Sequence, residues 1–202
     1  MKNKGCLSAA TLGIGLVAIL VILALWGVPT YNNFVKQDEN VSTKWSNVET
    51  VYQKRANLIP NLENTVKSYS QFEQETLTKV IEARSKATSI NLDPSNMTEQ
   101  DMARFQAAQG ELTGALSRLM AVVEQYPNLK ADQQYMNFQR EYTAIENSIR
   151  AETVNFNQAV DEYNNTVRKV PNNILANFTN FTVKPKFKAE AGAERAPEVF
   201  TN

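Results

Sequence analysis

Residues 7–28 read LSAATLGIGLVAILVILALWGV, an apolar run that contains no charged side chain. As an α-helix rising ~1.5 Å per residue, the run covers about 33 Å, which exceeds the roughly 30 Å hydrocarbon core of a bilayer. No charged residue occurs between Lys4 and Lys36, so the flanks also suit a membrane interface. We therefore expect residues 7–28 to cross a membrane and to contact its lipid.

This run is interpreted as an uncleaved signal anchor and not as a removable signal peptide. The apolar region of a signal peptide spans roughly 7–15 residues and is followed by small residues at the cleavage site. Here the run is longer, and its end carries bulky residues in the sequence Leu25-Trp26-Gly27-Val28-Pro29. We expect the anchor to remain attached to the rest of the chain.

The charges on the two sides of the run predict its orientation. Lys2, Lys4 and the amino terminus precede it, whereas Lys36 after it is offset by Asp38 and Glu39. Positively charged flanks stay on the cytoplasmic side of a membrane. We therefore expect the N-terminus in the cytoplasm and the remainder of the chain outside it.

The composition argues against several classes of function. The 21 Lys and Arg residues equal the 21 Asp and Glu residues, so there is no basic surplus for nucleic acid. The absence of histidine removes the usual general base and histidine-ligated zinc. Di-iron bundles likewise pair helical glutamates with histidine, although glutamates are available at Glu49, Glu63, Glu124, Glu146 and Glu152. We expect no catalytic, cofactor-binding or metal-ligating residues, and no enzyme activity.

Four stretches after the anchor carry apolar residues mostly three and four apart, the spacing of a bundle or coiled-coil seam. The first seam comprises Val41, Trp45, Val48, Tyr52, Ile59, Leu62, Val66 and Tyr69. The second comprises Phe72, Leu77, Val80, Ile81 and Ala87. The third comprises Met102, Phe105, Gln109, Leu112, Leu116, Leu119, Val123 and Tyr126. The fourth comprises Phe138, Tyr142, Ile145, Ile149, Thr153, Phe156, Val160, Tyr163, Val167 and Val170.

These patterns predict an all-α fold: an N-terminal transmembrane helix followed by a long-helix antiparallel bundle of three to four helices. Gly27 and Pro29 are expected to separate the anchor from the first bundle helix, because proline lacks an N–H and clashes with the preceding turn. The third helix is expected to begin near Asn96 or Thr98, and Asn96 with Glu99 has the spacing of a capping box.

Two further features concern packing. Gly110 and Gly114 lie beside the third seam, where we expect them to make room for a bulky neighbour such as Trp45. After Pro171, an apolar strip is expected to pack across the end of the bundle; it comprises Ile174, Leu175, Phe178, Phe181, Val183 and Phe187. From about Lys188 onward the chain has no periodicity and is interpreted as a mobile tail.

Three segments resemble the LemA family: YNNFVKQDENVSTKWSNVETVYQKRANLIPNLENTVKSY at 31–69, LSRLMAVVEQYPNLKAD at 116–132, and FQREYTAIENSIRAETVNFNQAVDEYNNTVRKVP at 138–171. The polar and marker residues that carry this resemblance are Asn32, Trp45, Arg55, Pro60, Asn61, Glu124, Pro127, Glu146, Asn147, Arg150, Asn157 and Asn164. The resemblance implies a single-span bacterial envelope protein with a helical extracytoplasmic domain. One relative takes part in building a specialised membrane compartment, and the family brings no catalytic motif.

The expected organisation follows from the patterns and the resemblance together. Residues 1–6 form a cytoplasmic N-terminus, 7–28 the transmembrane signal anchor, 31–187 a LemA-like helical bundle, and 188–202 the mobile tail. The expected location is the bacterial inner, cytoplasmic membrane, with a single pass, the N-terminus in the cytoplasm and the bundle outside.

One set of polar residues is a candidate site. Arg150, Asn157 and Asn164 are seven residues apart on one helix face, and Glu146 lies one turn before Arg150. Arg55 replaces an apolar residue in the first seam, so it can meet Glu146 or Glu124 across the bundle. These residues form either a partner-binding stripe or hydrogen-bonded layers that set helix register.

Two function classes fit these expectations. The first is a self-associating scaffold, a homo-oligomer that organises envelope proteins or membrane. The second is a regulatory adaptor or sensor that binds a peptide, an envelope protease or a small ligand in a groove of the bundle. A polar-lined pocket near Arg55, Glu146 and Arg150 would favour the second class.

Overall fold

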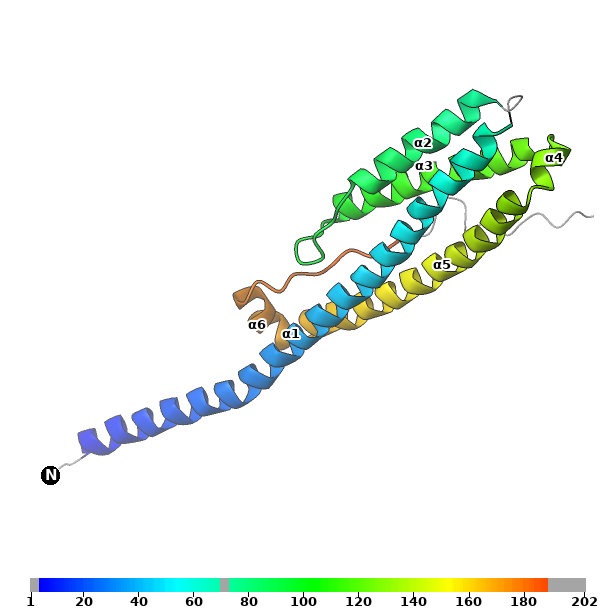
Figure 1. Ribbon diagram of the computed structural model, residues 1–202. Helices are drawn as coiled ribbons and strands as arrows, with labels where there is room; N and C mark the ends of the chain where they lie inside the picture. Colours follow the sequence, from blue (N-terminus) through cyan, green and yellow to red (C-terminus); the bar gives the residue numbers. More distant parts are fainter. Residues whose placement is uncertain (1–3, 70–72, 189–202) are drawn as a thin grey trace, which may run out of the picture.

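The computed structural model describes residues 4–69 and 73–188, with side chains from residue 11 onward. Figure 1 shows the arrangement of its helices. They are α1 (Lys4–Lys67), α2 (Gln74–Ser89), α3 (Glu99–Val123), α4 (Pro127–Lys130), α5 (Gln133–Arg168) and α6 (Asn172–Phe178). The four long helices run antiparallel in chain order, which confirms the predicted all-α fold with an apolar N-terminal helix and a bundle.

Helix α1 is one uninterrupted helix of 64 residues that contains both Pro29 and Pro60. The predicted break at Gly27 and Pro29 is therefore wrong. Pro29 has no N–H for the Leu25 carbonyl, yet the helix continues through it in one piece. In the next position, the Thr30 hydroxyl donates to the Trp26 carbonyl at 2.7 Å. Figure 1 shows α1 changing direction where it leaves the bundle, without losing its helical form. Anchor and bundle consequently share one helix.

Helix α3 starts at Thr98, the second of the two predicted starting positions. Thr98 is the N-cap, and a capping box joins its side chain and backbone to Asp101. Asn96 instead lies in the preceding loop, where its amide donates to the Asp93 carboxylate at 2.7 Å. Asn96 and Thr98 are both residue types that cap helices. Thr98 is the cap because the helix begins directly after it.

The C-terminal part of the chain returns to the anchor end of the bundle. Asp132 caps α5 by accepting from the N–H groups of Gln134 and Tyr135, and α5 contains the whole predicted fourth seam except Val170. After α6, residues 181–188 run as an extended segment, which we call the C-terminal strap. The strap ends at Lys188, which is bonded to its surroundings, and the remainder of the predicted tail lies outside the described residues.

Trp45 is fully buried, but the two glycines do not accommodate it. Its ring packs against Phe105 and Phe156, with ring centroids 5.3 and 5.4 Å away. Gly110 and Gly114 are exposed, and a Cβ built on either would meet nothing within 4 Å. The prediction that they make room for Trp45 is therefore wrong.

The bundle contains two apolar cores at different levels. The core nearer the anchor combines the start of α3 and the end of α5 with α1 and α6, and it includes Trp45, Phe105, Phe156 and Tyr163. The distal core combines α1, α2, α3, α4 and α5, and it includes Leu62, Leu116 and Tyr135. Between them lie two of the buried polar side chains, Arg55 and Gln109.

Candidate functional site

Arg55 lies at the centre of the bundle, with a relative exposure of 2%. Its Nη1 donates to Glu146 Oε1 on α5 at 3.0 Å and to Thr113 Oγ1 on α3 at 2.9 Å. Its Nη2 donates to the Gln109 carbonyl at 3.3 Å and to the side-chain oxygen of the same residue. A guanidinium presents donors in a fixed planar fork, so one side chain fixes α1 against α3 and α5.

Gln109 extends this network to a fourth helix. While its Oε1 accepts from Arg55, its Nε2 donates to the Ala87 carbonyl at the end of α2, at 3.3 Å. On α1 itself, the ring of Tyr52 lies 5.0 Å from the Arg55 guanidinium carbon, within cation–π range. We call Arg55, Gln109, Thr113 and Glu146 the central polar layer.

The central polar layer has the chemistry of a fixed ion pair. Glu146 is 29% exposed, so the pair lies between the buried centre and the solvent. Burial, with a smaller contribution from the Glu146 carboxylate, raises the pKa of the neighbouring Tyr142 to about 12. The tyrosine therefore stays protonated at neutral pH, and it supplies no general base beside the pair.

Asn157 and Asn164 bind the C-terminal strap. The Asn164 side chain accepts from the Lys184 N–H at 2.8 Å and donates to the Lys184 carbonyl at 2.9 Å. Asn157 repeats this two-bond pattern with Phe187, at 2.9 and 3.1 Å. Each amide thus satisfies the backbone of one strap residue in the way that a neighbouring strand would.

The spacing of the two asparagines matches the spacing of their targets. Residues 157 and 164 are about 10.5 Å apart along a helix at ~1.5 Å per residue. Residues 184 and 187 are about 10 Å apart along an extended chain at ~3.3 Å per residue. The seven-residue spacing that suggested a stripe therefore matches the distance between the two strap residues that the asparagines bind.

Other contacts hold the same strap. Gln106 on α3 makes the equivalent pair of bonds with Lys188, at 2.9 and 3.3 Å. The Lys184 ammonium, 9% exposed, pairs with Asp38 on α1 at 2.8 Å. Sequence reasoning did not identify Gln106, Thr113, Asp38 or Lys184. The signal for Gln109 was visible, because it is a polar residue within an apolar seam.

The predicted stripe does not form one open surface. Glu146 contacts Arg55, Asn157 and Asn164 contact the strap, and Arg150 is exposed on α5. Within the described residues Arg150 has no ion-pair partner. Neither of the two hollows described next is lined by Arg55, Glu146 or Arg150, the residues whose pocket would favour an adaptor.

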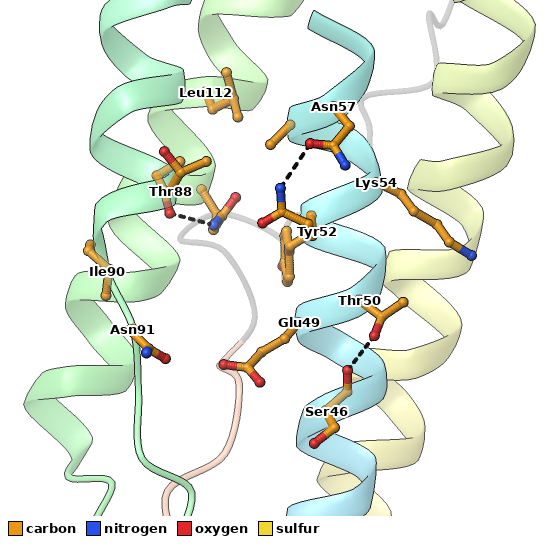
Figure 2. A pocket seen from close by; sticks show the side chains of 14 residues that line it. Ser46, Glu49, Thr50, Tyr52, Lys54, Asn57, Thr88, Ile90, Asn91 and Leu112 are labelled. Carbon is orange, nitrogen blue, oxygen red and sulfur yellow. Dashed lines mark hydrogen bonds between the residues drawn. The ribbon is translucent and has the colours of Figure 1, made fainter.

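One open groove of about 680 Å³ lies between α1 and the α2–α3 pair. Figure 2 shows Glu49, Tyr52 and Asn57 of α1 on one side of this groove and Thr88, Asn91 and Leu112 on the other. Burial raises the pKa of the Glu49 carboxyl. The groove is lined by both polar and apolar side chains, and across the described residues no group of three or more metal-ligating side chains accompanies it. A second groove, of about 830 Å³, lies between α3 and α5 and is lined by Met120 and Tyr142.

The strap contacts make a direct prediction. Asn157→Ala removes both side-chain bonds to Phe187, so the Phe187 N–H should exchange with solvent deuterium faster than in the unchanged chain. Gln158→Ala, at the exposed neighbouring position, is the matched control and should leave that rate unchanged. Hydrogen–deuterium exchange followed by mass spectrometry measures the exchange rate at Phe187 in both variants and in the unchanged chain. Equal exchange in all three chains would show that Asn157 does not hold the strap.

The chain is similar in sequence to several known proteins. Magnetosome protein MamQ 2 of Paramagnetospirillum magneticum is 26% identical, over 94% of this chain and 80% of its own length. Magnetosome protein MamQ of Magnetospirillum gryphiswaldense is also 26% identical, over 83% of this chain and 66% of its own length. Protein LemA of Metamycoplasma hominis is 26% identical, over 72% of this chain and 63% of its own length.

The profile of the LemA family matches residues 44–200. This range includes most of the bundle, the central polar layer and the asparagines that bind the strap. The match extends well beyond a single motif and agrees with the resemblance in the sequence. The chain belongs to the LemA family.

Proposed function

We propose that this protein is a membrane-anchored, non-catalytic scaffold that self-associates and organises envelope proteins or membrane. The observation that carries the proposal is the continuity of α1, whose apolar part and bundle part form one helix. The apolar part is long and apolar enough to cross a membrane and is not buried against the rest of the chain. Contacts between anchors would therefore be transmitted directly to the bundles outside the membrane.

The relatives and the anchor surface support this role. Two of the relatives are magnetosome proteins by name. Small residues in a transmembrane helix allow close helix contact, and the anchor carries Gly13, Gly15 and Ala18 on its described surface. A Cβ at Gly13 would meet nothing within 4 Å, so this position is open to a second helix.

The proposed location is the bacterial inner membrane, with the N-terminus in the cytoplasm and the bundle outside. The flanking charges support this orientation, because Lys2 and Lys4 precede the span and the following lysine is offset by two carboxylates. The equal numbers of acidic and basic residues support a partner other than nucleic acid, such as another envelope protein.

A second candidate is an adaptor or sensor, and the groove between α1 and α2–α3 favours it. The groove is large enough for a short peptide segment or a small ligand. It adjoins the central polar layer, because Gln109 lines it while accepting from Arg55. Occupation of the groove would then act on the contact that joins the helices.

The orientation is tested by labelling an introduced cysteine. In a Cys6→Ser background, Ala103→Cys places a thiol at an exposed position on α3. We expect a membrane-impermeant maleimide to label this thiol in cells with an intact inner membrane, because the bundle lies outside the cytoplasm. If the cells have an outer membrane, it is permeabilised first. Labelling that requires lysis of the inner membrane would contradict the orientation.

Self-association is tested with full-length protein in nanodiscs by mass photometry. We expect a mass above that of one chain, and Gly13→Leu should shift it toward the monomer because a leucine separates the helix backbones. Ile22→Leu is the control, since it conserves volume on the opposite face of the helix. A monomeric unchanged chain would contradict the scaffold and would leave the adaptor as the stronger candidate.

A further inference from the structure

Helix α6 presents an apolar face that the described chain does not cover. Ile174 and Phe178 are four residues apart, so they share one helix face, and they are 62% and 88% exposed. Val170, just before the helix, is 80% exposed. The exposed ring of Phe178 contributes almost no hydrophobic stabilisation to the folded chain. Its exposure together with that of Ile174 indicates that this face is buried against another surface, such as a membrane or a second protein.

The position of this face is fixed by aromatic contacts. Phe181, three residues after Phe178, packs on α1 with its ring centroid 5.7 Å from that of Tyr31 and 5.4 Å from that of Phe34. Figure 1 shows α6 beside α1 at the end of the bundle nearest the anchor. The apolar face therefore lies at the level at which α1 enters the bundle.

This level coincides with the membrane surface. The apolar run ends at Val28, and Tyr31 is about 4.5 Å further along the helix at ~1.5 Å per residue. The headgroup region of one leaflet is roughly 5–8 Å thick, from the difference between total and hydrocarbon thickness. Phe181 therefore lies within the headgroup region, and the adjoining α6 lies at its depth.

The charges around α6 also fit a lipid surface. No charged residue occurs between Lys169 and Lys184, and none occurs in α1 between Lys4 and Lys36. Arg168 and Lys169 are exposed immediately before α6. An apolar face next to an exposed basic pair is the pattern of segments that lie in the interface of an anionic bilayer.

We propose that α6 is a second membrane contact, in which Ile174 and Phe178 insert into the headgroup–acyl boundary of the leaflet from which α1 emerges. Arg168 and Lys169 lie among anionic lipid headgroups. With one transmembrane contact and one interfacial contact, the bundle keeps a fixed tilt and rotation relative to the bilayer. This inference rests on α1 crossing the membrane.

The test uses spin labels on the full chain, in a Cys6→Ser background, reconstituted into vesicles of phosphatidylethanolamine and phosphatidylglycerol. Phe178→Cys places the label on α6, and its high exposure leaves the fold undisturbed. Leu20→Cys reports on the anchor, and Val154→Cys, 50% exposed on α5, is the matched control away from the interface. Relaxation by oxygen, which enters lipid, is compared with relaxation by a water-soluble nickel chelate.

We expect the labels at positions 178 and 20 to be relaxed mainly by oxygen, and the label at 154 mainly by nickel. Nickel relaxation at 178 equal to that at 154, with 20 protected, would overturn the α6 contact while leaving the anchor intact. Nickel relaxation at 20 would overturn both. Dipolar broadening at 178 that disappears on dilution with unlabelled protein would identify a second copy as the covering partner and would also overturn the proposal.

Discussion

The buried guanidinium of Arg55 is the interaction on which the arrangement of the bundle depends. A charge taken out of water must be paired and hydrogen-bonded, and Arg55 finds those partners only if α3 and α5 are at the correct height beside α1. Gln109 also fixes the position of α2, because its side chain donates to the Ala87 carbonyl. One side chain therefore fixes the register of four helices, and the two apolar cores lie on either side of it.

The register of the helices also determines the structure of the bundle end nearest the anchor. When α5 is held at the correct height against α1, Asn157 and Asn164 face the strap and bind it at Phe187 and Lys184. The strap in turn begins at Phe181, which packs on α1 just beyond the anchor. The internal polar contacts therefore position the end of the bundle that adjoins the bilayer, and α1 joins both ends in one helix.

The sequence was sufficient for the features that depend on local pattern. The seams of α3 and α5 and the end of α5 before Pro171 follow from apolar spacing and turn chemistry, and the structure has them except at Val170, which lies beyond α5 and is exposed. The continuity of α1 through Pro29 was not predictable in this way, because apolar spacing and turn chemistry do not tell whether the flanking turns hold a proline inside one helix.

The candidate site was predictable only in part. Arg55 was visible as a polar residue in an apolar seam, and Glu146 was one of two acceptors within reach of a bundle geometry. The partners of Asn157 and Asn164 were hidden, because an extended strap has no periodicity that identifies its contacts. Arg150 shared their helix face, and its exposure depends on the strap lying alongside α5 only from residue 157 onward.

The most direct test of this account is the unfolding free energy of the bundle, from a chain lacking residues 1–30, with and without Arg55. Arg55→Ala leaves Glu146 and Gln109 without their partner, and the account predicts a loss of about 3–5 kcal/mol in urea denaturation. Lys54→Ala, at the adjacent exposed position, should change stability by less than about 0.5 kcal/mol. A loss below about 1 kcal/mol for Arg55→Ala would contradict the central role of this residue.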